Sequence, residues 1–228
     1  MKAAESFLKE VDAAVEQNKM LRHPFYQTWS AGMLSREALA GYVKQYYHFV
    51  QAFPTLISAT HSNTPRLDVR QVLLENLMEE ERGAGNHPGL WLRFSNALGV
   101  SLQDASSAPL LPETENALAS LRSLTRDSSY LEGVAALYAY ESQIPEVAGV
   151  KIDGLKRFYG ITDPDALAFF TVHQEADVEH SNSERTILAD HALEPGDRAA
   201  CIEAARSSAK ALWGLLDGVE RAYVRRQN

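Results

Sequence analysis

The sequence predicts an all-α protein, and its apolar composition is the first reason. It contains 31 Ala and 27 Leu but only 14 Val and 6 Ile. Ala and Leu favour helices, whereas Val and Ile favour strands. No alternating apolar stretch is bounded by a hairpin turn. A chain of 228 residues can bury one sizeable core, and no linker divides it. We therefore expect one domain over residues 1–228, built as a bundle of seven or more helices.

Helix boundaries near the N-terminus follow from prolines and a capping residue. The apolar spacing predicts a helix over about 3–20, which ends before Pro24 because the residue before a proline avoids the helical region. A short helix follows over about 24–31. Ser35 is a suitable N-cap for a long aromatic helix that continues to about residue 60. Pro54 lies inside that helix and predicts a kink.

Glycines and prolines also delimit the helices in the middle of the chain. A helix over about 66–84 follows Pro65 and is ended by Gly83 and Gly85. Pro88 occupies a plausible first position of the next helix, which ends near residue 98. Residues 100–112 contain three Ser and two Pro, so we expect a loop there.

The C-terminal part is predicted to hold the remaining helices. They span about 113–126, 129–147, 153–159, 164–189 and 197–225. Pro145 lies near the expected end of the second of these, and Gly160 ends the third. Pro164 and Pro195 precede the last two, in keeping with the preference of proline for the first helical turn.

Charge and cysteine content exclude several classes of protein. The formal net charge of −8 argues against a nucleic-acid binder and against docking on anionic membranes. No apolar run approaches the roughly 18 residues of a membrane span. Glu5 and Lys9 interrupt the stretch that a signal peptide would need to be apolar. Cys201 is the only cysteine, so no intrachain disulfide or thiolate zinc site can form. We expect a cytoplasmic protein.

The motif with the clearest chemistry is a triplet of metal-ligand residue types. His173, Asp177 and His180 are spaced by four and three residues, which places them on one face of a helix. The same face continues backwards to Phe170 and Ala166 and forwards to Glu184 and Ile187, and is otherwise apolar. Burying such groups is unfavourable unless an ion binds them, and this ligand mixture suits iron, manganese or zinc. The alternative is an ordinary solvated face.

Two other segments present carboxylates toward the expected core. Glu141 shares a stripe with Leu137, although a paired structural glutamate is an equal alternative. Periodicity selects Glu80 as the inward residue of an acidic run. His87 follows after two glycines, so helical arithmetic does not fix its direction. Together with the triplet, these residues could form a two-metal site. A ferritin-like bundle fits poorly, because it needs two Glu-x-x-His motifs and the chain has only Asp177-x-x-His180.

Several longer stretches resemble one protein family. They are HPFYQTW at 23–29, YVKQYYHF at 42–49, ENLMEEERGAGNHPGLW at 75–91, LYAYESQIPEVAGVKIDGLKRFYGI at 137–161 and HQEADVEH at 173–180. The chain resembles the TenA/PqqC group of the heme-oxygenase-like fold, and within it the CADD-like proteins (chlamydial protein associating with death domains). The resemblance implies a seven-helix bundle that forms a homodimer. It also implies an Fe/Fe or Mn/Fe pair that uses dioxygen and an external reductant. The implied metal ligands are Glu80, His87, Glu141, His173, Asp177 and His180.

The same resemblance implies an unusual reaction. CADD-like proteins form 4-aminobenzoate for folate synthesis by consuming one of their own tyrosines, with a lysine as the amino donor. By motif, the candidate tyrosines are Tyr26 and Tyr42, the candidate amine is Lys151, and Tyr140 beside a metal ligand is a candidate electron relay. Without the resemblance, each tyrosine would be read as a packing residue and Lys151 as a solvated loop residue.

Four other functions remain as alternatives at this point. A TenA-like thiamin hydrolase would need a cysteine nucleophile, which residues 129–147 lack. A PqqC-like oxidase would work on a quinone precursor without a full set of metal ligands. A dimetal oxygenase acting on an external small molecule would need an open pocket beside the metals. A non-enzymatic role in binding death domains has no separate interaction module in this sequence to support it.

Overall fold

The computed structural model describes residues 2–225, and this part of the chain is helical without any β-strand. Residues 1 and 226–228 of the expected domain lie outside the described residues. The α-helices are α1 (Lys2–Glu16), α2 (Pro24–Ser30), α3 (Arg36–Asn63), α4 (Leu67–Glu81), α5 (His87–Ala97), α6 (Leu102–Ser106), α7 (Pro112–Arg126), α8 (Tyr130–Glu141), α9 (Ile144–Tyr159), α10 (Pro164–His191) and α11 (Pro195–Val219). Short 3₁₀ turns lie at Met20–Arg22 and Gly83–Gly85, and a π-helical turn at Glu220–Val224.

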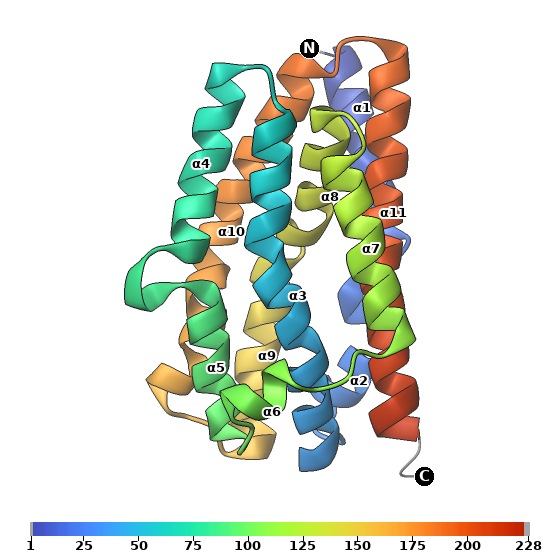
Figure 1. The fold of residues 1–228 in the computed structure, drawn as a ribbon. Helices are drawn as coiled ribbons and strands as arrows, with labels where there is room; N and C mark the ends of the chain where they lie inside the picture. Colours follow the sequence, from blue (N-terminus) through green and yellow to red (C-terminus); the bar gives the residue numbers. More distant parts are fainter. Residues whose placement is uncertain (1, 226–228) are drawn as a thin grey trace.

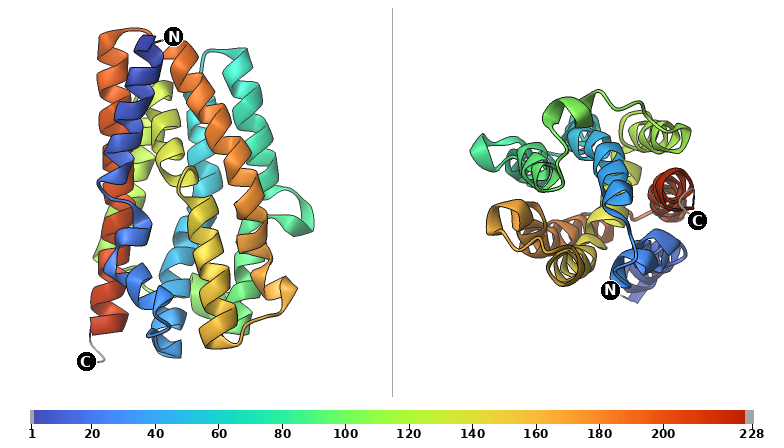
Figure 2. Two further views of the ribbon diagram at one scale, coloured as in Figure 1. Left: turned by 180° about the vertical axis from the view of Figure 1, so that it is seen from behind. Right: turned by 90° about the horizontal axis from the view of Figure 1, so that it is seen from below.

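The long helices run roughly along one axis, with the two ends of the chain at opposite ends of the bundle (Figure 1). Helix α3 crosses the middle of the molecule, and α10 and α11 also extend over most of its length. Helix α4 is followed by α5, and α8 by α9, so two of the rods are interrupted midway along the bundle (Figure 2). Both interruptions lie beside α10, which packs against α4, α5, α8 and α9.

The all-α prediction is confirmed, but the helix boundaries differ from it in two places. The helix expected over 129–147 ends at Glu141, and α9 starts at Ile144 and includes the whole of the expected 153–159 helix. Pro145 therefore starts a helix rather than ending one, because proline is tolerated in the first turn. The loop expected at 100–112 contains α6, which Ser101 and Asp104 cap reciprocally.

The structure has eleven α-helical segments within residues 2–225. The sequence predicted ten helical ranges, and α6 is the additional helix. The seven helices implied by the resemblance are therefore an underestimate of the number of segments. Helix α3 runs without interruption through Pro54. Within the described residues, no helix combines the length and apolar character that crossing a membrane requires.

Aromatic side chains fill the interior around α3. Tyr42, Tyr46 and Phe49 are fully buried on this helix, and Trp91 from α5 packs on Tyr46 with ring centroids 5.0 Å apart. Trp29 from α2 packs edge to face on Tyr42, at a centroid distance of 5.9 Å. Aromatic rings bury large apolar areas, so this part of the core excludes water.

Candidate metal centre

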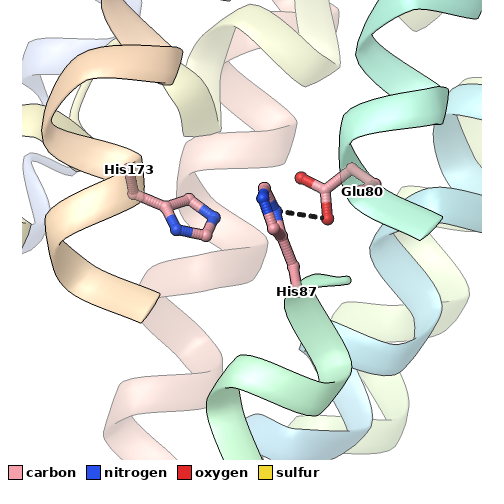
Figure 3. Close-up of side chains that lie close together, drawn as sticks. All are labelled: Glu80, His87 and His173. Carbon is pink, nitrogen blue, oxygen red and sulfur yellow. Dashed lines mark ion pairs between the residues drawn. The ribbon is translucent and has the colours of Figure 1, made fainter. Parts of the chain in front are cut away.

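The structure brings the six expected ligand residues together in two groups of three. Within each group, one ligand atom from each residue lies within 4.8 Å of the others, and all six residues are buried. Glu80, His87 and His173 form the first group, shown in Figure 3. Glu141, Asp177 and His180 form the second.

The first group depends on the break between α4 and α5. Glu80 lies in the last turn of α4, and His87 is the first residue of α5. Between them the chain makes a 3₁₀ turn, where Gly83 has a φ of 69° that favours glycine. This turn directs His87 inward, so its Nδ1 lies 2.8 Å from Oε2 of Glu80 (Figure 3). Helical periodicity does not extend across these glycines, so it could not predict that the His87 side chain points inward.

The remaining ligand residues come from α8 and α10. Glu141 is the last residue of α8 and is fully buried. His173, Asp177 and His180 share one buried face of α10, with exposed fractions of 3%, 1% and 9%. The alternative of an ordinary solvated face for this triplet is therefore wrong.

Hydrogen bonds orient the imidazole rings of α10. Nδ1 of His173 lies 2.6 Å from the carbonyl oxygen of Phe169. Because a carbonyl only accepts, Nδ1 carries the proton and leaves the lone pair of Nε2 for an ion. Nε2 of His180 lies 3.1 Å from Oε2 of Glu79. The other ring nitrogen, Nδ1, lies 3.5 Å from Oδ1 of Asp177 and 3.7 Å from Oε1 of Glu141. A carboxylate behind a histidine is a common support of a metal ligand.

Among the described residues, the acidic groups of the centre have histidines as their basic partners. Burial raises the pKa of Asp177 to about 8 and raises that of Glu141. Burial alone would lower the pKa of His180, but Asp177 and Glu141 outweigh it and raise that pKa to about 9. Among the described residues, no Lys or Arg forms an ion pair with these carboxylates. The centre thus holds closely spaced carboxyl groups whose ionised forms are disfavoured by burial.

Unpartnered atoms show that a cation fits this centre. The buried polar atoms without a hydrogen bond include Oε2 of Glu141, Oδ2 of Asp177, Nδ1 of His180 and both carboxylate oxygens of Glu184. Buried polar groups are normally hydrogen-bonded. Divalent ions coordinated by imidazole and carboxylate would satisfy these atoms and would favour the ionised carboxylates.

Three residues around the centre were not among the candidate site residues, although Glu184 was expected on the same helix face as His180. Asn76 donates from Nδ2 to Oε1 of Glu141 at 2.9 Å. Glu184 is only 1% exposed, and its pKa is raised well above the usual range by burial and then by neighbouring Glu141. Glu79 is exposed, as expected, but it also contacts His180. Helical spacing could have indicated two of them. Asn76 lies four residues before Glu80 on α4, and Glu184 lies four residues after His180 on α10, so both share a face with a candidate ligand.

The expected lysine lies in the aromatic interior rather than in a solvated loop. Lys151 belongs to α9 and is 2% exposed. Its Nζ donates a hydrogen bond to Oη of Tyr42 at 2.6 Å. It also lies 4.8 Å from the ring centroid of Tyr46 and 5.5 Å from that of Tyr26. Burial lowers the pKa of the Lys151 ammonium to about 7.

Tyr140 lies between the metal ligands and this aromatic interior. It precedes Glu141 in the chain, and its hydroxyl is 3.3 Å from that of Tyr46. Its ring packs on Phe49 and Phe53 at centroid distances of 4.8 Å. Tyr46 was not among the expected site residues, yet it touches both Tyr140 and Tyr42.

The cysteine lies on a helix that carries none of the candidate ligand residues. Cys201 lies on α11 and is fully buried. Burial raises the pKa of its thiol to about 12, which disfavours the thiolate that a nucleophile requires. This counts against a TenA-like hydrolase.

Comparison with known proteins identifies the family. A family model described as an iron-containing redox enzyme matches residues 40–213. The chain belongs to this family. A protein named 4-aminobenzoate synthase from Nitrosomonas europaea is 43% identical over 230 residues, covering 97% of this chain and 94% of that one. A protein of the same name from Chlamydia muridarum is 41% identical, covering 93% and 89%.

A solved structure confirms the expected architecture. The crystal structure of a TenA homolog from Pseudomonas syringae superposes with a TM-score of 0.80, covering 95% of this chain and 92% of that one. Its sequence identity of 18% supports a shared fold only. The resemblance to the heme-oxygenase-like TenA/PqqC group is thus confirmed for a chain of the iron-containing redox enzyme family.

Proposed function

We propose that this protein is an oxygen-activating dimetal enzyme that forms 4-aminobenzoate from one of its own tyrosines. The relatives that cover most of the chain bear the name 4-aminobenzoate synthase. The observation that carries the proposal is the contact between Lys151 and Tyr42, in a dry aromatic interior next to six buried metal-ligand residues. An amine and a phenol held together provide the nitrogen and the ring of the product.

We further propose that the metal pair is Fe/Fe or Mn/Fe. Its ligands would be Glu80, His87, Glu141, His173, Asp177 and His180, a mixture of imidazole and carboxylate that both metals accept. When bound, the pair supplies the transfer of electrons from an external reductant to dioxygen and the oxidation of a nearby phenol.

The roles of the chain's own residues follow from their positions. Lys151 has a pKa of about 7, so a large fraction of its amine is neutral and nucleophilic near neutral pH. Its nitrogen would replace the phenol oxygen of Tyr42 or Tyr26, so the Nζ–Cε bond of the lysine breaks and the phenol oxygen leaves as water. The Cα–Cβ bond of the tyrosine also breaks, and dioxygen oxidises the benzylic carbon to the carboxylate of the product. Tyr140 would relay an electron between the metal centre and Tyr46, since the hydroxyls of Tyr140 and Tyr46 are 3.3 Å apart.

The size of the adjacent pocket favours an internal substrate over an external one. The pocket that reaches Asn76, His180 and Glu184 has a volume of about 80 Å³. Pockets for small organic ligands usually measure about 300–1,000 Å³. The alternative of an oxygenase acting on an external small molecule is therefore less well supported.

The test is a single-turnover assay on protein labelled with ¹³C in its tyrosine rings and ¹⁵N at lysine. The purified chain is loaded with Fe(II), with and without Mn(II), and given reductant and oxygen. We expect doubly labelled 4-aminobenzoate, at most one molecule per chain, and altered masses at Lys151 and at Tyr26 or Tyr42. Tyr47→Phe serves as the control and should retain product formation. Unlabelled product, or more than one molecule per chain, would contradict consumption of the protein's own residues.

The setting of the reaction is also proposed. We infer a cytoplasmic homodimer that receives electrons from a separate donor and has no nucleic-acid or membrane partner. The resemblance supports the dimer, and the net charge of −8 supports the absence of polyanionic partners. Light scattering of the purified protein tests the dimer directly, and a monomer at micromolar concentration would contradict it.

A further inference from the structure

A narrow acidic opening lies between α4 and α10 and reaches the second group of metal-ligand residues. Its mouth carries Glu75 and Glu79 from α4 and Glu179 from α10, which are all exposed. Its inner end is formed by His180 and Glu184. The opening therefore connects solvent with a group that we propose binds metal.

Glu184 lies at the inner end of the opening with no basic partner among the described residues. It is 1% exposed, and neither of its oxygens has a hydrogen-bond donor among the described residues. It lies against Glu141, another carboxylate, rather than against a base. A buried carboxylate without a partner is costly, so its position at the inner end of the opening points to a cationic ligand.

We propose that this opening is the route by which divalent metal ions reach the centre. Glu75, Glu79 and Glu179 raise the local concentration of cations at the mouth. Glu184 binds the incoming ion transiently and passes it to Glu141 and His180. This inference rests on the proposed dimetal function, since it takes the second group as the destination.

The dimensions and charge of the opening agree with this role. A volume of about 80 Å³ holds a partly hydrated ion, since each water occupies roughly 30 Å³. It does not hold an organic cofactor. Arg82 lies beside Glu75 and Glu79 in a shallow neighbouring pocket and offsets only part of the negative charge. Attraction between exposed charges is screened by salt, so uptake along this route depends on ionic strength.

The experiment measures the rate of Fe(II) uptake by the metal-free full-length protein. Protein and Fe(II) are mixed without oxygen, and a chromogenic chelator added at timed intervals reports the unbound iron. In Glu75→Gln/Glu179→Gln we expect uptake to be roughly fivefold slower at low salt, with the same final iron content as wild type. The difference should shrink at high salt. Arg82→Gln, which removes a positive charge beside the mouth, should speed uptake.

A matched control and a second variant make the result specific. Glu10→Gln/Glu115→Gln changes the net charge equally at exposed positions away from the opening and should not change the rate. Glu184→Gln should slow uptake while keeping its salt dependence. Mouth variants with the wild-type rate and normal iron content would overturn the access route alone. A wild-type chain that takes up no iron would overturn the proposed dimetal function and the route together.

Discussion

Replacing Lys151 by methionine should stabilise the metal-free protein, although it removes the proposed amine donor. The lysine is 2% exposed, and burial lowers its pKa from an ordinary value of 10.5 to about 7. When folding lowers the pKa of a lysine, the free energy of unfolding is reduced. The full reduction applies at pH values below the pKa of the folded state. The cost disappears as the pH rises toward the unfolded value. Methionine is similar in length, fits irregular apolar spaces and avoids this cost.

The size of the effect follows from the pKa change. At about 1.4 kcal/mol per pKa unit, a fall from 10.5 to about 7 corresponds to roughly 4 kcal/mol at pH 7 and roughly 2 kcal/mol at pH 9. Loss of the hydrogen bond to Tyr42 opposes the gain by about 1–3 kcal/mol. We therefore expect Lys151→Met to raise the free energy of unfolding by roughly 1–3 kcal/mol at pH 7. The increase should be about 2 kcal/mol smaller at pH 9.

The assay is urea unfolding of both proteins at the two pH values in the presence of a chelator. Chelation removes the contribution of metal binding from the free energy of unfolding. Lys156→Met changes an exposed lysine of the same helix and should show no such dependence on pH. A gain that is equal at pH 7 and pH 9, or a destabilised variant at both, would refute the reasoning.

Three further outcomes are expected. Asp177→Asn should lower the metal content by about one ion per chain in elemental analysis, because it removes a charged ligand, whereas exposed Glu175→Gln should leave it unchanged. Gly154→Ala should lower the free energy of unfolding by roughly 1–3 kcal/mol, since its Cβ would lie 2.5 Å from Nε1 of Trp29; thermal unfolding checks this, and an unchanged midpoint would contradict it. Single-turnover product formation should rise between pH 6 and pH 8 as Lys151 loses its proton, and a flat profile would exclude that lysine as the nucleophile.

Helical periodicity predicted that most residues of the candidate metal centre face inward, because they lie on regular helices. His173, Asp177 and His180 occupy one face of α10 without any break, so spacing alone places them together. Glu80 and Glu141 follow the apolar stripes of α4 and α8. These predictions needed no knowledge of how the helices pack.

The remaining features depend on breaks between helices, where periodicity gives no information. The orientation of His87 follows from a short 3₁₀ turn that contains a left-handed Gly83. The start of α9 could not be predicted from Pro145. A proline can stand in the first turn of a helix or near the point where the preceding helix ends, and the sequence alone does not distinguish the two. The burial of Lys151 depends on the start of α9 at Ile144, because this start places Lys151 within a helix, on the face toward Tyr42.

The candidate ligands come from four separate helices, and this has a consequence for the stability of the fold. Cys201 is the sole cysteine, so the chain has no covalent cross-link of its own. Ions bound by these residues would tie α4, α5, α8 and α10 together and act as the missing cross-links. A ligand that binds only the folded state at a hundred times its Kd adds about 2.7 kcal/mol of stability. The lifetime of the folded chain would thereby depend on the free metal concentration around it.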